Sequence, residues 1–173
     1  MCIKLLYLLL LAFPVELKIV PDLQEMHGCP GYDYEMDFSN VQFDFDDDGY
    51  IIINGNFTFL TDVVAPYPVY FHSERMERGE WRPTLIDKPL RDFCASLLDP
   101  LEVWYPVMKQ LDQLHCPFSA GHVIKLDNIK YKFPVKISHQ FLGDWRIYME
   151  HRDVMRDSEP LGCLMQYFTV IEI

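Results

Sequence analysis

FDFDDDGYIII, residues 43–53, is the stretch that decides the fold class of this chain. Before the turn, Phe43 and Phe45 flank Asp44 in the alternation of a half-buried strand, and after it residues 50–53 form an apolar run. An Asp-Gly step between two such segments is one of the strongest short-range signals for a β-hairpin. We therefore predict two antiparallel strands joined by an acidic turn.

The acidic turn also matches the first half of a calcium-binding loop, D-x-D-x-D-G. Asp44, Asp46 and Asp48 occupy its acidic positions, and Gly49 follows them. The twelfth position, which requires a bidentate glutamate, is Gly55, and the flanking residues are typical of strands rather than helices. We therefore predict an acidic hairpin tip without a bound metal, and no other motif in the chain predicts a cofactor.

The residues after the hairpin supply a second turn signal and a glycosylation sequon. The Asn-Gly pair at residues 54–55 predicts a turn that leads into a strand over residues 56–60. Asn56 begins the sequon N-F-T, and a sugar attached there would require its side chain to face solvent. Period-two alternation then directs Phe57 and Phe59 toward the protein interior.

The rest of the chain adds several short segments that alternate between apolar and polar residues. We expect the charged residues 74–80 to form an exposed loop after a strand edge that Pro66 and Pro68 indicate. Further strands are expected over residues 122–126, 131–137, 144–150 and 163–173. Seven to nine short strands predict a mainly β fold, an antiparallel β-cup or sandwich with a short helical insert.

The helical insert is expected within residues 89–114. Pro100 and Pro106 interrupt the pattern, and Asp99, with Pro100 after it and Glu102 three residues on, is typical of a helix N-terminus. We therefore predict two short helices with a break near Asp99. Their apolar face, with spacings of three and four residues, consists of Phe93, Leu97, Leu101, Trp104, Met108 and Leu111.

The first residues have the pattern of a secretory signal peptide. Lys4 precedes an apolar run over residues 5–13, which is shorter than the roughly 20 residues needed to cross a bilayer as a helix. The alternative is a buried core segment. We predict a signal peptide over residues 1–16, followed by a single domain over residues 17–173 of a secreted, extracellular protein.

Charge restricts the classes of partner. Fifteen Lys and Arg residues against 26 Asp and Glu residues give a formal net charge of −11. So acidic a chain lacks the positive surface that binds phosphate backbones, which excludes nucleic acid as a partner. Beyond the leader, no second long apolar run predicts a transmembrane segment.

Four cysteines remain once Cys2 is removed with the leader, namely Cys29, Cys94, Cys116 and Cys163. An even number in a secreted chain predicts two disulfide bonds, and spacing alone leaves all three pairings open. A zinc site at Cys116 and the preceding histidine is the weaker alternative, because no C-x-x-C or H-x-x-x-H spacing accompanies it.

Catalytic motifs are missing from the sequence. It contains no serine elbow, HExxH motif, P-loop or recognisable pair of carboxylates, and the six histidines are scattered. We therefore predict that the protein is not an enzyme.

The content of large apolar side chains suggests a ligand site. Twelve Phe, ten Tyr, three Trp and eight Met residues occur, many on expected inward faces. Such residues can build an ordinary Phe-rich core, or they can leave an adaptable apolar cavity. The expected cavity residues are Phe57, Phe59, Trp145, Ile147, Met149 and Tyr167, covered by Trp104 and Met108.

Three short stretches resemble a known insect family. Residues 93–94, 115–118 and 143–146 read FC, HCPF and GDWR. In this layout the chain resembles the ganglioside-activator-like secreted proteins, which include the chemosensory B proteins of flies and are similar to the mammalian ganglioside activator. The resemblance implies an antiparallel β-cup with an apolar cavity, disulfides Cys29–Cys163 and Cys94–Cys116, and no catalysis.

We therefore expect a non-enzymatic carrier of a lipid or other hydrophobic small molecule, with pheromone perception as the role that the resemblance suggests and an extracellular receptor as a further partner. The alternative is an extracellular protein-interaction module with a solid core, which acts through its acidic surface.

Overall fold

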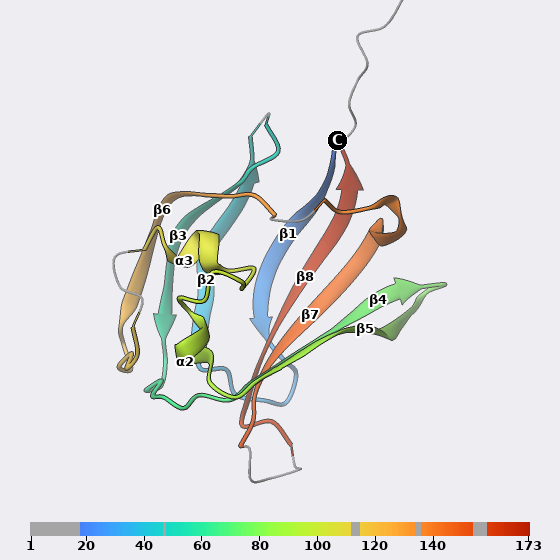
Figure 1. Ribbon diagram of the computed structural model, residues 1–173. Coiled ribbons are helices and arrows are strands. Elements are labelled where there is room, and N and C mark those ends of the chain that lie inside the picture. The colour runs from blue at the N-terminus through green and yellow to red at the C-terminus, as the bar shows by residue number, and fades with distance from the viewer. Residues whose placement is uncertain (1–17, 47, 112–114, 134–135, 154–158) are drawn as a thin grey trace, which may run out of the picture.

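The computed structural model describes residues 18–46, 48–111, 115–133, 136–153 and 159–173, which form two antiparallel sheets (Figure 1). The five-stranded sheet has the order β1-β8-β7-β4-β5 and consists of β1 (Ile19–Gly28), β8 (Gly162–Glu172), β7 (Gly143–His151), β4 (Val69–Glu77) and β5 (Glu80–Leu90). The three-stranded sheet has the order β2-β3-β6 and consists of β2 (Met36–Phe45), β3 (Ile51–Phe59) and β6 (Val123–Tyr131). The helical segments are α2 (Phe93–Ser96), α3 (Tyr105–Met108) and the 3₁₀ turn η1 (His139–Phe141).

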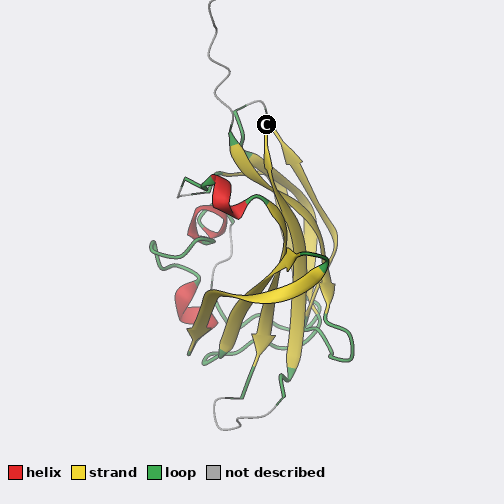
Figure 2. Cartoon of the chain, turned by 90° about the vertical axis from the view of Figure 1, so that its right-hand side faces the viewer, coloured by secondary structure: helices red, strands yellow, loops and turns green. Residues whose placement is uncertain are grey.

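Together the sheets form a curved wall, and Figure 2 shows the two helices on its concave side. One cluster of buried side chains fills the space between the sheets and includes Ile51, Ile53, Val69, Leu126 and Leu164. Ile51 and Ile53 of β3 lie two positions apart, because alternate side chains of a strand point to the same face. The prediction of a mainly antiparallel β fold with a short helical insert and two disulfides is confirmed.

The predicted hairpin of residues 43–53 is present. Phe45 of β2 pairs with Ile51 of β3. At the tip, the Asp46 carboxylate accepts hydrogen bonds from the backbone N–H groups of Asp48 at 3.1 Å and Tyr50 at 2.8 Å. The acidic residue therefore organises the turn, as Asp side chains commonly do.

The second turn predicted at residues 54–55 was wrong, because β3 continues through it. Gly55 pairs with Val41 of β2, and the β3–β6 ladder shifts register between Ile53 and Gly55. Gly55 has φ +105°, and a Cβ atom there would lie 1.8 Å from the Asn40 carbonyl oxygen. Glycine is thus required for a β-bulge and close strand approach, which use the same conformational freedom as a turn.

The loop predicted over residues 74–80 was also wrong. The chain forms a hairpin there, with Glu77 of β4 paired with Glu80 of β5 and positive φ angles at Arg78 and Gly79. Because β5 is a sheet edge with mostly exposed side chains, its sequence lacks the apolar alternation that reveals a strand. The strand expected over residues 131–137 was likewise misplaced, since Tyr131 ends β6.

The helical insert is shorter than predicted. Asp92 caps α2, and its side chain accepts from the Cys94 N–H at 3.0 Å. The helix start predicted at Asp99 was wrong, because α3 begins at Tyr105 after Trp104. Asp99 instead stabilises a turn by accepting from the Leu101 N–H at 2.9 Å. Leu101 is 90% exposed and therefore does not belong to the predicted apolar face, whereas Leu97 is buried.

The two disulfides are Cys29–Cys163, which joins β1 to β8, and Cys94–Cys116, which ties α2 to the segment before β6. This pairing is the one that the family resemblance implies, and it removes Cys116 from any zinc site. Of the chain that the structure describes, no helix is long and apolar enough to cross a membrane. The predicted signal peptide lies outside the described residues.

Candidate functional site: a groove between two sheet edges

Half of the expected cavity residues meet in the interior. Phe57 and Phe59 of β3 are buried in the main core cluster, and Met108 of α3 and Met149 of β7 pack against it. Trp104 joins them indirectly, because its ring stacks at 5.4 Å on a phenylalanine of β4 that contacts the same cluster. These side chains therefore belong to the packed core or lie against it.

Trp145 and Ile147 lie further along the inner face of β7. The Trp145 ring stacks with Phe168 at a centroid distance of 6.3 Å, and its indole N–H donates to the Phe141 carbonyl at 2.7 Å. Ile147 is half-buried on the same face by alternation. Trp145 therefore packs in a layer separate from the phenylalanines of β3.

Tyr167 was wrongly assigned to this interior. It pairs with Arg146, one residue away from the inward Trp145, so it faces the opposite side of the five-stranded sheet. There it packs against Met165 and the Cys29–Cys163 disulfide. Alternation in the sequence separates the two faces of a strand but does not say which of them meets the other sheet.

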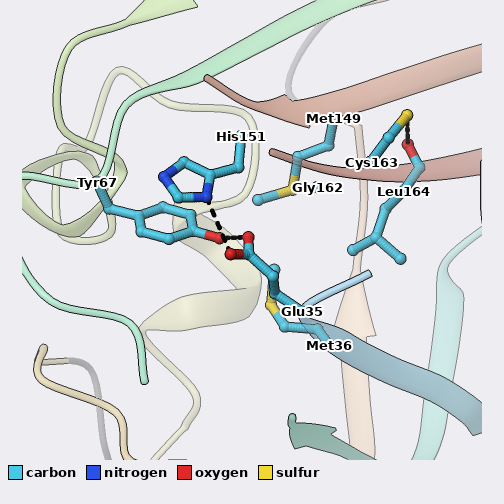
Figure 3. A pocket seen from close by; sticks show the side chains of 8 residues that line it. All are labelled: Glu35, Met36, Tyr67, Met149, His151, Gly162, Cys163 and Leu164. Carbon is cyan, nitrogen blue, oxygen red and sulfur yellow. Dashed lines mark hydrogen bonds and ion pairs between the residues drawn. The ribbon is translucent and has the colours of Figure 1, made fainter. Parts of the chain in front are cut away.

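A closed junction between the sheets lies beside the Cys29–Cys163 disulfide (Figure 3). The Tyr67 hydroxyl donates to one carboxylate oxygen of Glu35, and the His151 Nδ1 lies 2.9 Å from the other. The Tyr67 and His151 rings stack at 4.1 Å. These three residues, here called the Glu35 junction, are among those that line a hollow of about 10 Å³, which is no more than one water molecule occupies.

The electrostatics of the Glu35 junction indicate a structural role. Burial would raise the pKa of the Glu35 carboxyl, but the hydrogen bonds from His151 and Tyr67 outweigh it and lower this pKa. Burial and the adjacent carboxylate raise the pKa of Tyr67. Because Glu35 precedes β2, Tyr67 precedes β4 and His151 ends β7, the cluster ties the two sheets together and leaves no room for a substrate.

The larger space is a groove of about 360 Å³ between β1 and β2, which are edge strands of different sheets. In β1 the pairing with β8 shifts register between Leu23 and Met26, so β1 bends where the groove opens. The residues that line it are Leu23, Gln24 and Glu25 of β1 and Val41, Gln42, Phe43 and Asp44 of β2.

The groove is amphipathic across its depth. Leu23, Val41 and Phe43 pack against the main core cluster and form an apolar floor. Gln42 and Asp44 alternate with them along β2 and are exposed at the mouth, as are the side chains at residues 24–25. Such a combination of an apolar base and a few polar groups is typical of small-molecule sites.

The sequence analysis missed this groove. The alternation of Val41 and Phe43 with polar residues does show which side chains of β2 face inward. Nothing local indicates that β2 lies beside β1, because the two strands belong to separate sheets.

The predicted glycosylation site lies in the central strand of the three-stranded sheet. Asn56 of β3 is half-buried, and it pairs with Asn40 on one side and Lys125 on the other. Phe57 and Phe59 are buried and Thr58 is half-buried.

Charged and aromatic side chains gather on the outer face of the five-stranded sheet. The Arg146 guanidinium lies 4.4 Å from the centre of the Trp81 ring and forms an ion pair with Glu74. The His72 ring stacks on Tyr148 at 4.5 Å. Glu74 and Glu150 both have cationic partners here, since Glu150 lies within ion-pair distance of His72 and Arg152.

Within the described ranges, no group of three His, Cys, Asp or Glu side chains is arranged to hold a metal ion. Comparison with protein-family models finds no match for this chain, and comparison with curated proteins finds none either.

Proposed function

We propose that this protein is a secreted, non-catalytic binding protein for a hydrophobic small molecule, which it holds in the groove between β1 and β2. The observation that carries the proposal is the groove itself, with a volume of about 360 Å³ and an apolar floor at Leu23, Val41 and Phe43 beneath a polar mouth. Its volume lies at the lower end of the range for ligand sites.

Two features support secretion. The two disulfides are typical of an oxidising compartment, and residues 5–13 have the composition of a signal-peptide core. The same disulfide pairing supports the resemblance to the ganglioside-activator-like family, as does the cup of antiparallel strands. We therefore propose membership of that family, with carriage of a lipid-like or pheromone-like ligand as the role.

A fluorescence titration tests the binding function. The probe is the neutral dye N-phenyl-1-naphthylamine, and we expect saturable binding with a large rise in emission. Val41→Phe fills part of the groove with a larger side chain, so the dye can no longer bury the same apolar area against the floor. Because that buried area supplies the affinity, dye binding should weaken roughly tenfold or more.

The matched control is Val123→Phe, at a 46% exposed position on β6. It adds the same bulk outside the groove and should leave dye affinity unchanged. Circular dichroism and thermal unfolding establish that both variants are folded. Absence of saturable binding, or equal binding by the two variants, would refute the assignment of the groove.

An interaction module remains the second candidate, and the outer face of the five-stranded sheet favours it. Tyr and Trp side chains, together with Arg146, are the residue types that most often dominate protein interfaces. A delipidated protein that binds no dye, yet binds a defined extracellular partner and loses that binding on Trp81→Ala, would support this candidate.

A further inference from the structure

The charge at the mouth of the groove restricts the ligand more than its apolar floor does. Of the described residues that line the groove, the charged ones are Glu25 and Asp44, and neither Lys nor Arg is among them. Both acidic side chains are exposed at the outer end, on opposite strands. The mouth is therefore negative on both sides.

The size of the groove restricts the ligand as well. A volume of about 360 Å³ lies near the lower end of the roughly 300–1,000 Å³ range of small-molecule sites. One alkyl or terpenoid chain suits such a space, and the two chains of a membrane phospholipid do not. The apolar floor and exposed mouth further orient such a molecule, with its chain inward and its head group outward.

We propose that the preferred ligand is a single-chain amphiphile with a positively charged head group, such as a protonated alkylamine. The inference rests on the proposed binding function and adds the chemical class of the ligand. A cationic head group meets an acidic side chain on each bounding strand, Glu25 of β1 and Asp44 of β2, whereas a fatty-acid carboxylate there meets two like charges. The net charge of −11 acts in the same direction at longer range.

On the β2 side, Lys130 Nζ lies 3.4 Å from Asp46, two residues from Asp44 on the same strand face. On the β1 side, the basic neighbour of the mouth is His27. Its Nε2 lies 3.7 Å from Glu25, and its side chain is half-exposed. The test is done at pH 8, where an alkylamine is protonated. Low ionic strength is used because salt screens exposed charges.

The experiment measures displacement of N-phenyl-1-naphthylamine by dodecylamine, dodecanol and dodecanoate, each below its micelle concentration. The three compounds share one chain and differ in head-group charge. We expect the amine to bind most tightly and the carboxylate most weakly, with roughly a tenfold ratio between them. Glu25→Gln combined with Asp44→Asn should reduce this ratio to about twofold or less.

The matched control is Glu77→Gln combined with Asp127→Asn, which removes two exposed carboxylates from β4 and β6. It changes net charge equally and should retain most of the amine preference. Equal binding of amine and alcohol, tight binding of dodecanoate, or a preference that survives Glu25→Gln/Asp44→Asn would overturn the ligand class while dye binding still supports the groove. If the dye does not bind at all, the proposed function fails and the ligand class with it.

Discussion

The Glu35 junction and the groove both lie where the β2 side of the three-stranded sheet meets the five-stranded sheet, yet the sheets are tied together at the junction and stand apart at the groove. Near the connection from β1 to β2, a half-buried carboxylate, a tyrosine and a histidine lie around a hollow of only about 10 Å³. Further along, at Leu23 and Val41, a space of about 360 Å³ remains open. Because backbone hydrogen bonds do not join these edges into one sheet, side chains decide where the wall is closed.

The comparison predicts that changes at the junction affect stability, whereas changes at the groove affect binding. Three experiments on the junction test the first half of this statement, and the Val41 and Glu25/Asp44 variants test the second.

The largest effect is expected from the disulfide beside the junction. Cys29→Ser combined with Cys163→Ser should lower the free energy of unfolding by about 4–5 kcal/mol, because the bond joins residues 134 apart in sequence. Cys94→Ser combined with Cys116→Ser opens a separation of only 22 residues and should cost about 3 kcal/mol. Urea unfolding of both variants measures the difference, and a larger loss for the second pair would contradict this view.

A smaller effect is expected from Tyr67→Phe, which removes the hydroxyl group that donates to Glu35. The carboxylate then loses a donor in a partly buried site, so stability should fall by about 1–3 kcal/mol. Dye affinity should stay within about twofold, because the groove lies elsewhere.

The control for this variant is Tyr131→Phe, at a second buried tyrosine. Among the described contacts, its hydroxyl has no hydrogen bond comparable to that of Tyr67, so little change in stability is expected. An equal loss for both variants would mean that the hydrogen bond to Glu35 is unimportant.

The mildest effect concerns pH. The pKa of Glu35 is lowered in the folded protein from its ordinary value of 4.5, despite burial, by hydrogen bonds from His151 and Tyr67. As the pH falls, the Glu35 carboxyl is therefore protonated in the unfolded chain before it is protonated in the folded protein. The contribution of Glu35 to stability is complete above about pH 5 and is lost as the pH falls below 4.5 through the folded pKa.

Denaturation measured at pH 6 and pH 4 in wild type and Glu35→Gln tests this linkage. The variant should show a shallower loss of stability between the two pH values, although Glu150, whose pKa is also lowered, retains part of the dependence. An unchanged slope would exclude Glu35 as a source of acid sensitivity.

Local sequence signals predicted two kinds of element. These are hairpins, whose strands follow each other directly in the chain, and strands whose residues alternate clearly between apolar and polar. The hairpin at residues 43–53 and the strands β7 and β8 are of these kinds. The exposed edge strand β5 was missed because its side chains do not alternate in polarity. Gly55 was interpreted as part of a turn because a β-bulge and a turn can both require a positive φ angle, which glycine adopts readily.

By itself, the sequence determined the mainly antiparallel β fold, the acidic hairpin tip and the presence of two disulfides, since alternation, Asp-Gly turns and an even cysteine count are properties of neighbouring residues or of composition. The tertiary structure alone decided that Tyr67, Glu35 and His151 meet, that Tyr167 faces outward, and that β1 leaves a groove beside β2. Those outcomes depend on how two sheets are placed against each other. That placement is set by contacts between residues far apart in the chain, and local sequence patterns cannot predict such contacts.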